Sequence, residues 1–212
     1  MEYAHINNSR VYILQSLPKA QVAANGNIAV STSRTLCSWG IKCFAFEIFR
    51  FACVAPLLEK EFDTDRRYHF VHWIGHGGNA GAMVGGEVVP WSDFNDALMN
   101  PFASVLDRTV FIISTCQGMY SSKASINAHG GCLPLGIIAS LSPISWPCAM
   151  QGALFFYQSH LLFGKNLINS IASPFTLIYG KEQEAINKAI RTGLSNPCLN
   201  LFYHVFDSYH NH

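Results

Sequence analysis

The sequence has few charged residues, and it lacks several patterns that would assign it to a class directly. Lysine, arginine, aspartate and glutamate make up 13% of the 212 residues, while 50% are hydrophobic. An average soluble domain has roughly a quarter charged residues. The formal net charge of +1 gives no electrostatic footprint for nucleic acid or for an anionic membrane. A surface so poor in charge favours a large partner interface or self-association.

The seven cysteines are odd in number and form no C-x-x-C pair, which argues against a disulfide framework and against a zinc ribbon. We expect no metal and no cofactor. The N-terminus lacks the charged start and apolar core of a signal peptide. The longest apolar run, 44–58, is interrupted by Glu47, Arg50 and Pro56, which are costly in a bilayer. We therefore expect a soluble, cytoplasmic protein with no membrane insertion and no nucleic-acid partner.

Strand-like and helix-like segments alternate along a chain whose length suits one domain, 1–212, with a core over 10–193 and a tail over 194–212. The pattern predicts a loop over 19–27 and a hairpin over 82–89, where Gly85-Gly86 separates two short apolar runs. This alternation favours an α/β sandwich with a mainly parallel sheet. The predicted strands are 11–17, 41–47, 68–75, 109–114, 135–140 and 175–179, and the predicted helices are 31–39, 49–62, 93–99, 147–163, 165–172 and 182–191.

Two of the predicted strands end in residues that carry chemistry. The run 68–74 leads through His76 into Gly77 and Gly78, and the run 110–114 leads to Cys116 and a following glycine. The carboxyl ends of parallel strands share one edge of a sheet, where open α/β sheets bind ligands. The sequence therefore predicts a cysteine nucleophile, Cys116, with a histidine base, His76.

A catalytic cysteine needs a neighbour that lowers the pKa of its thiol or takes its proton, and histidine is suited to this near neutral pH. Attack on a carbonyl also builds negative charge on the carbonyl oxygen. We nominate the backbone N–H groups of Gly77 and Cys116 as the oxyanion hole.

These residues carry a resemblance to caspase-like cysteine peptidases. The caspase signature is Q-A-C-[RQG]-G, with its histidine about fifty residues upstream. The segment S-T-C-Q-G, 114–118, matches at its last three positions and departs at the first two. An apolar block ending in His-Gly, followed by another ending in Cys, resembles clan CD peptidases, and the CHAT family among them most closely. The similarity extends from the first strand to 172 and includes I-G-H-G-G, V-P-W-S-D-F, I-I-S-T-C-Q-G, L-G-I-I-A-S and the segment from 146 to 165.

The resemblance implies a caspase-like three-layer α/β/α sandwich and an endopeptidase that cleaves a protein partner with a His76/Cys116 dyad. The uncharged segment 141–146 corresponds to the stretch beside the bound peptide in the family, which implies substrate contacts from Ser142, Ile144, Ser145 and Trp146 and favours a neutral or apolar substrate residue. By analogy with bacterial CHAT proteins, it also implies a regulated effector of a bacterial defence system, activated by a protein partner or by homo-oligomerisation.

Several other readings stay open at this stage. One alternative is a catalytically inactive interaction module that resembles caspases only in fold, and another is an enzyme that transfers an acyl group without proteolysis. The pair His72 and His76 suggests an H-x-x-x-H metal site, but residues four apart on a strand are roughly 13 Å apart. His129 and Cys132 form a second histidine–cysteine cluster that has no preceding apolar strand. A cysteine at a strand end is also commonly a small core residue.

Overall fold

The computed structural model describes residues 8–63, 65–118, 120–121, 134–139 and 146–163. Within them a seven-stranded sheet runs in the order β2-β1-β3-β4-β5, and β6 pairs with both β3 and β7. Strands β1, β2, β3, β6 and β7 are parallel, and only the β3–β4–β5 pairings are antiparallel. The strands are β1 (Ser9–Ser16), β2 (Lys42–Glu47), β3 (Tyr68–Gly77), β4 (Gly81–Val84), β5 (Glu87–Pro90), β6 (Thr109–Ser114) and β7 (Gly136–Ala139).

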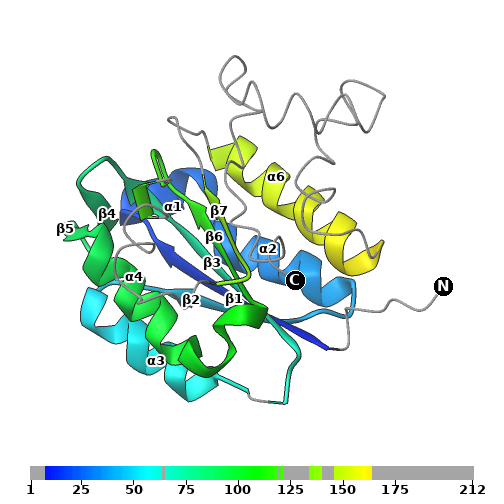
Figure 1. Cartoon of the computed structure of the whole chain (residues 1–212). Coiled ribbons are helices and arrows are strands. Elements are labelled where there is room, and N and C mark those ends of the chain that lie inside the picture. The colour runs from blue at the N-terminus through cyan, green and yellow to red at the C-terminus, as the bar shows by residue number, and fades with distance from the viewer. Residues whose placement is uncertain (1–7, 64, 119, 122–133, 140–145, 164–212) are drawn as a thin grey trace, which may run out of the picture.

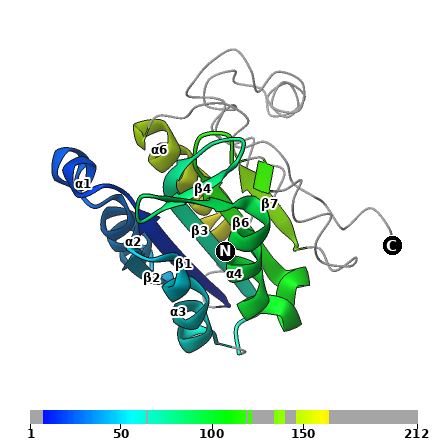
Figure 2. The same ribbon diagram turned by 90° about the vertical axis from the view of Figure 1, so that its left-hand side faces the viewer.

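Helices cover both faces of the sheet (Figures 1 and 2). The α-helices are α1 (Lys19–Asn25), α2 (Ile28–Ser38), α3 (Val54–Glu61), α4 (Trp91–Met99) and α6 (Trp146–Tyr157). The other helical segments are η1 (Phe51–Cys53), η2 (Asn100–Arg108) and η3 (Gln158–Leu162). No helix among the described residues is both long and apolar enough to cross a bilayer.

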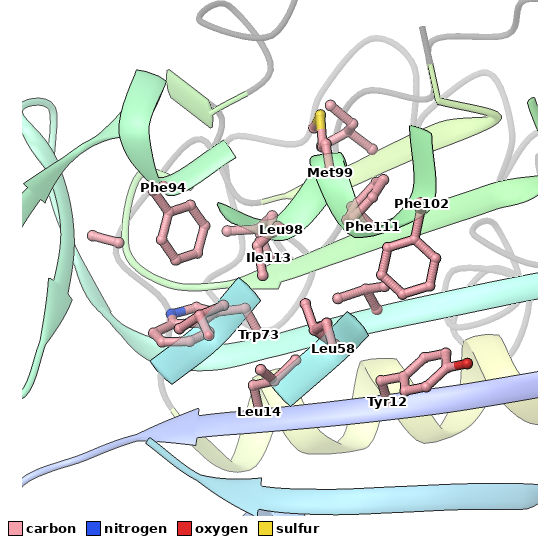
Figure 3. Close-up of a cluster of buried hydrophobic side chains, with 14 of the residues drawn as sticks. Tyr12, Leu14, Leu58, Trp73, Phe94, Leu98, Met99, Phe102, Phe111 and Ile113 are labelled. Atoms are coloured by element: carbon pink, nitrogen blue, oxygen red, sulfur yellow. The ribbon is translucent and has the colours of Figure 1, made fainter. Parts of the chain in front are cut away.

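Alternation along the central strands divides the core into two layers. In β3, Phe70 and Ile74 pack with α2 and α6, whereas Val71 and Trp73 pack with α3 and α4. Side chains of successive strand residues point to opposite faces, so both faces of a buried parallel strand must be apolar. Figure 3 shows the second layer, where Trp73 meets Phe94 edge to face with ring centroids 4.9 Å apart. The predicted three-layer α/β/α architecture with a mainly parallel sheet is confirmed.

The structure corrects three local predictions. Residues 19–25, predicted as part of a loop, form α1, which begins after Pro18 with Gln21 N–H donating to the Pro18 carbonyl at 2.9 Å. Helix α2 starts earlier than predicted, because the side chain of Asn27 caps it by accepting from Val30 N–H. Helix α4 starts at Trp91, two residues before the predicted start at 93.

The remaining predicted elements in the described residues are present with small shifts in their ends. The predicted helix 49–62 is divided into η1 and α3, and the predicted helix 147–163 into α6 and η3. The segments predicted at 165–172, 175–179 and 182–191 lie outside the described residues.

Candidate functional site

The site is built on two neighbouring strands. Strands β3 and β6 are parallel partners, and their register ends with Ile74 opposite Ser114. His76 and Cys116 are each two residues further along the chain. Because side chains two apart on a strand share a face, His76 continues the face of Ile74 toward α2 and α6, whereas Cys116 lies in the turn after the end of β6. Cys116 is half-buried and packs against that layer of the core.

The residue after the histidine touches the cysteine segment directly. A Cβ atom added to Gly77 would lie 3.0 Å from Thr115 Oγ1 and 3.2 Å from the carbonyl oxygen of Cys116. Those separations are tighter than ordinary side-chain contacts, so glycine is what allows the two backbones to approach so closely. The structure therefore places Gly77, the residue after His76, against Thr115 and Cys116, which the sequence had placed at a separate strand end.

The predicted strand 68–75 ends before His76. In the structure β3 continues to Gly77, so His76 lies on the strand itself. His76 pairs with Met83 and Gly77 pairs with Ala82 in the antiparallel ladder to β4. The end of this extension is also fixed, since Trp91 Nε1–H donates to the carbonyl of Gly78 at 2.9 Å. The hairpin thus holds the histidine on a rigid element rather than on a free turn.

The turn after β6 is tight at the cysteine. Thr115 N–H donates to the Ile113 carbonyl at 3.0 Å, and Gly118 N–H donates to the Thr115 carbonyl at 3.3 Å. Between them Gln117 has φ 57°, the one described non-glycine residue with positive φ. A side chain in this left-handed region carries a backbone cost, and such residues cluster at functional sites.

The end of this turn is anchored to helix α4. Asn95 Nδ2–H donates to the Ser121 carbonyl at 2.7 Å, and the Ser121 hydroxyl donates to Asn95 Oδ1 at 2.5 Å. Asn95 and Ser121 are both fully buried. The segment that follows the cysteine is therefore held to the body of the domain by a paired polar contact in the core.

Helix α1 supplies a third group to the site. Gln21 Oε1 lies 2.7 Å from Nε2 of His76. An amide oxygen only accepts, so in this arrangement Nε2 carries the ring proton and Nδ1 keeps its lone pair. A base that is oriented by a third side chain is the usual construction of a nucleophile–base pair.

His72, two residues before Ile74 on the same face, is a structural residue. Its Nε2 is 2.9 Å from the Ser114 hydroxyl, and its ring lies 6.0 Å from that of Tyr157. Complete burial lowers the pKa of His72 to about 3, so the ring stays neutral near pH 7. His72 therefore does not serve as the base, and in the part of the chain that the structure describes no group of three potential metal ligands gathers around it or elsewhere.

A cleft opens beside the histidine. It has a volume of about 330 Å³ and runs along residues 76–81, with Met83 and Val88 of the hairpin forming its other wall. Hollows at the carboxyl edge of an open α/β sheet are the common ligand-binding position in this class of fold.

The structure does not describe every predicted site residue. Ser142, Ile144 and Ser145 lie outside the described residues, as do His129 and Cys132. Trp146 is the first residue of α6. The proposed oxyanion donors are backbone groups of Gly77 and Cys116, at the contact between the two strand ends.

Sequence reasoning missed Gln21 because it treated 19–27 as a loop. The stretch from Lys19 to Asn25 contains neither glycine nor proline and follows Pro18, which is a helix-start signal that was available. Its position directly after β1 also puts it at the same sheet edge as the two other strand ends.

Comparison with known proteins finds similarity among solved structures. No family model matches the chain, and no curated protein matches it in sequence. Among solved structures, it is similar to the Arg specific cysteine proteinase gingipain R, with a TM-score of 0.51 and 13% identity over 84% of this chain and 44% of that chain. The match thus spans less than half the length of the neighbour. At this identity the likeness concerns the fold, and the chain has a caspase-like α/β fold with a mainly parallel central sheet.

Proposed function

We propose that this chain is a cysteine endopeptidase in which Cys116 is the nucleophile and His76 is the general base. The observation that carries the proposal is the contact between the two strand ends, where the backbone of Gly77 lies against Thr115 and Cys116. A histidine and a cysteine that share one sheet edge can form the pair in which the thiol gives up its proton.

In the proposed reaction, Nδ1 of His76 takes the thiol proton and the Cys116 sulfur attacks the peptide carbonyl carbon. The backbone N–H groups of Gly77 and Cys116 donate to the oxyanion. Collapse of the tetrahedral intermediate breaks the C–N bond, and the imidazolium gives its proton to the leaving amine. A water molecule then loses a proton to His76 and attacks the thioester, which releases the carboxylic acid and restores the thiol.

Two further features support the proposal. The left-handed backbone of Gln117 directly follows the nucleophile, in a turn that Thr115 and Gly118 close by backbone hydrogen bonds. Gln21 holds Nε2 of the imidazole, which leaves Nδ1 to act as the base. A site that is rigid and oriented before substrate binds lowers the cost of reaching the reactive geometry.

We further infer that the enzyme belongs to the CHAT group of caspase-like peptidases and cleaves a protein partner. This inference is supported by the I-G-H-G-G and I-I-S-T-C-Q-G segments, which begin on β3 and β6 respectively and run past the ends of these strands. A role as a regulated effector of a bacterial defence system, activated by a protein partner or by self-association, follows from the resemblance alone.

Labelling with a peptide that carries a thiol-directed electrophile tests the dyad. We expect modification at Cys116, mapped by mass spectrometry, and a rate that falls about 100-fold or more in His76→Ala, the usual range for loss of a general base. Cys53→Ala is the matched control, because Cys53 is an exposed thiol away from the two strand ends. It should leave labelling at Cys116 unchanged.

The outcome of this labelling separates the alternatives. An inactive interaction module would show labelling at Cys116 that is slow and indifferent to His76→Ala. An enzyme that transfers acyl groups without proteolysis would be labelled normally but would leave the peptide bonds of its bound protein uncut. Cleavage of a protein target by Cys116→Ala at the wild-type rate would contradict the assignment of the nucleophile.

A further inference from the structure

A groove lined by apolar side chains lies on the β1 and β2 side of His76. It consists of two hollows, of about 240 Å³ and about 360 Å³, which share Leu17, Lys19, Ile48 and Phe49 as lining residues. His76 lines the first hollow, so the groove begins at the proposed base. The two hollows are separate from the cleft along residues 76–81. His76 and Met83 line both the first hollow and that cleft.

The wall of this groove is rigid. The tip of the β4–β5 hairpin is held over it because Gly85 N–H donates to the Ser16 hydroxyl at 3.1 Å. The same glycine has φ +61°, and a Cβ atom there would lie 2.1 Å from the carbonyl oxygen of Phe49. The hairpin tip therefore presses directly on the backbone after β2, and the groove exists before any ligand binds.

Exposed apolar side chains gather around the histidine. Five large apolar residues are exposed within the described part of the chain. Of these, Phe49 and Met83 line the first hollow, and Met83 and Val88 line the cleft; His76 lines both. Phe49 is 59% exposed at the mouth of the groove. Concentrated exposed apolar surface marks a binding region more often than scattered single residues do.

The chemistry of the lining selects for a neutral, apolar ligand group. Leu17, Ile48, Phe49 and Met83 supply the large apolar side chains of the lining, Lys19 lines both hollows, and Glu47 lines the second. Both charged side chains are exposed to solvent, which screens their effect on a bound acidic or basic side chain. A cavity of about 150 Å³ is already large enough for benzene. The first hollow is larger than that.

We propose that this groove binds a large apolar side chain, of the size of leucine or phenylalanine, from the residue that adjoins the scissile bond of the substrate. The inference rests on the proposed peptidase function, because it is the position of His76 in the groove wall that puts this side chain next to the reacting bond. It assigns the selection of substrate to Leu17, Ile48, Phe49 and Met83, which the sequence analysis did not identify.

The first experiment measures binding without turnover. Calorimetry with full-length Cys116→Ala uses matched blocked peptides that differ at one residue, which is leucine, phenylalanine, alanine, aspartate or arginine. We expect the leucine and phenylalanine peptides to bind about tenfold or more tightly than the alanine peptide, the range that a hydrophobic pocket provides. The aspartate and arginine peptides should bind no better than the alanine peptide.

The second experiment changes the groove. Phe49→Glu introduces a carboxylate at its mouth and is expected to shift the preference from leucine toward arginine, which general loss of structure would not do. Phe163→Glu is the matched control, because Phe163 is a phenylalanine of similar exposure, 64%, that lines neither hollow. It should keep the wild-type preference.

The outcomes distinguish this inference from the proposed function. If Cys116 is labelled in a His76-dependent manner but apolar peptides have no advantage, or Phe49→Glu leaves their advantage unchanged, the groove assignment is wrong and the peptidase proposal stands. If Cys116 is not labelled, while apolar peptides bind to the groove and lose their advantage in Phe49→Glu, the proposed peptidase function is wrong and the groove remains a peptide-binding site.

Discussion

Lowering the pH from 7 to 5 is expected to destabilise the folded chain through His72. The ring is completely buried between β6 and α6, and its burial lowers the pKa of His72 from 6.5 to about 3. The unfolded chain therefore binds a proton at this residue below about pH 6.5, while the folded chain does not until the pH approaches 3. Stability is lost progressively as the pH falls through this window.

The magnitude follows from the pH difference. At pH 5 the medium is 1.5 units below the ordinary histidine pKa, and each unit corresponds to about 1.4 kcal/mol, so His72 removes about 2 kcal/mol of the free energy of unfolding. Domains of this kind have a total of roughly 5–15 kcal/mol. Burial also lowers the pKa of His69, to about 4, and its ring packs among Tyr12, Phe62 and Phe102, so it acts in the same direction.

Urea unfolding at pH 7 and pH 5 measures the effect, with the free energy taken by linear extrapolation. His72→Gln removes the titrating ring and keeps a polar group facing Ser114. Its stability at pH 7 should be lower than that of the wild type, but its loss between pH 7 and pH 5 should be smaller by about 2 kcal/mol. Equal pH dependence in wild type and His72→Gln would refute the reasoning.

Three further predictions concern the site. In a peptidase assay, Gly77→Ala should reduce kcat/KM by about tenfold or more, because the added Cβ would lie 3.0–3.2 Å from atoms of Thr115 and Cys116. Gly78→Ala is the control and should be close to wild type, because the nearest atom to its added Cβ is 3.8 Å away. Gln21→Glu should raise the pH at which activity is half maximal, since a carboxylate beside the imidazole stabilises the protonated form of His76. Gln21→Ala should lower kcat more than it changes KM. An unchanged pH profile in Gln21→Glu would contradict an orienting role for Gln21. Asn95→Ala should cost about 1–3 kcal/mol in urea unfolding, because it removes two buried hydrogen bonds to Ser121. A loss below about 0.5 kcal/mol would show that the anchor is unimportant.

The sequence by itself determined the parts of the structure that depend on local pattern. Mostly apolar runs predicted β3 and β6, since strands that are buried on both faces are rich in hydrophobic residues on both. Gly85-Gly86 predicted the hairpin, and both glycines have positive φ. The order of the two strands, with a histidine after one and a cysteine after the other, was enough to propose a dyad.

Only the tertiary structure decided how these elements meet. A run of apolar residues does not specify its partner or its register, which depend on the burial of residues distant in sequence. The register that puts Ile74 opposite Ser114 brings the two strand ends level, and the ladder to β4 extends β3 through His76. Helix α1 is too short to be stable from its own residues, and its Gln21 contacts His76 only in the folded domain. The sequence therefore predicted the candidate dyad, His76 and Cys116, while long-range packing placed Gln21 beside His76 and formed the groove next to it.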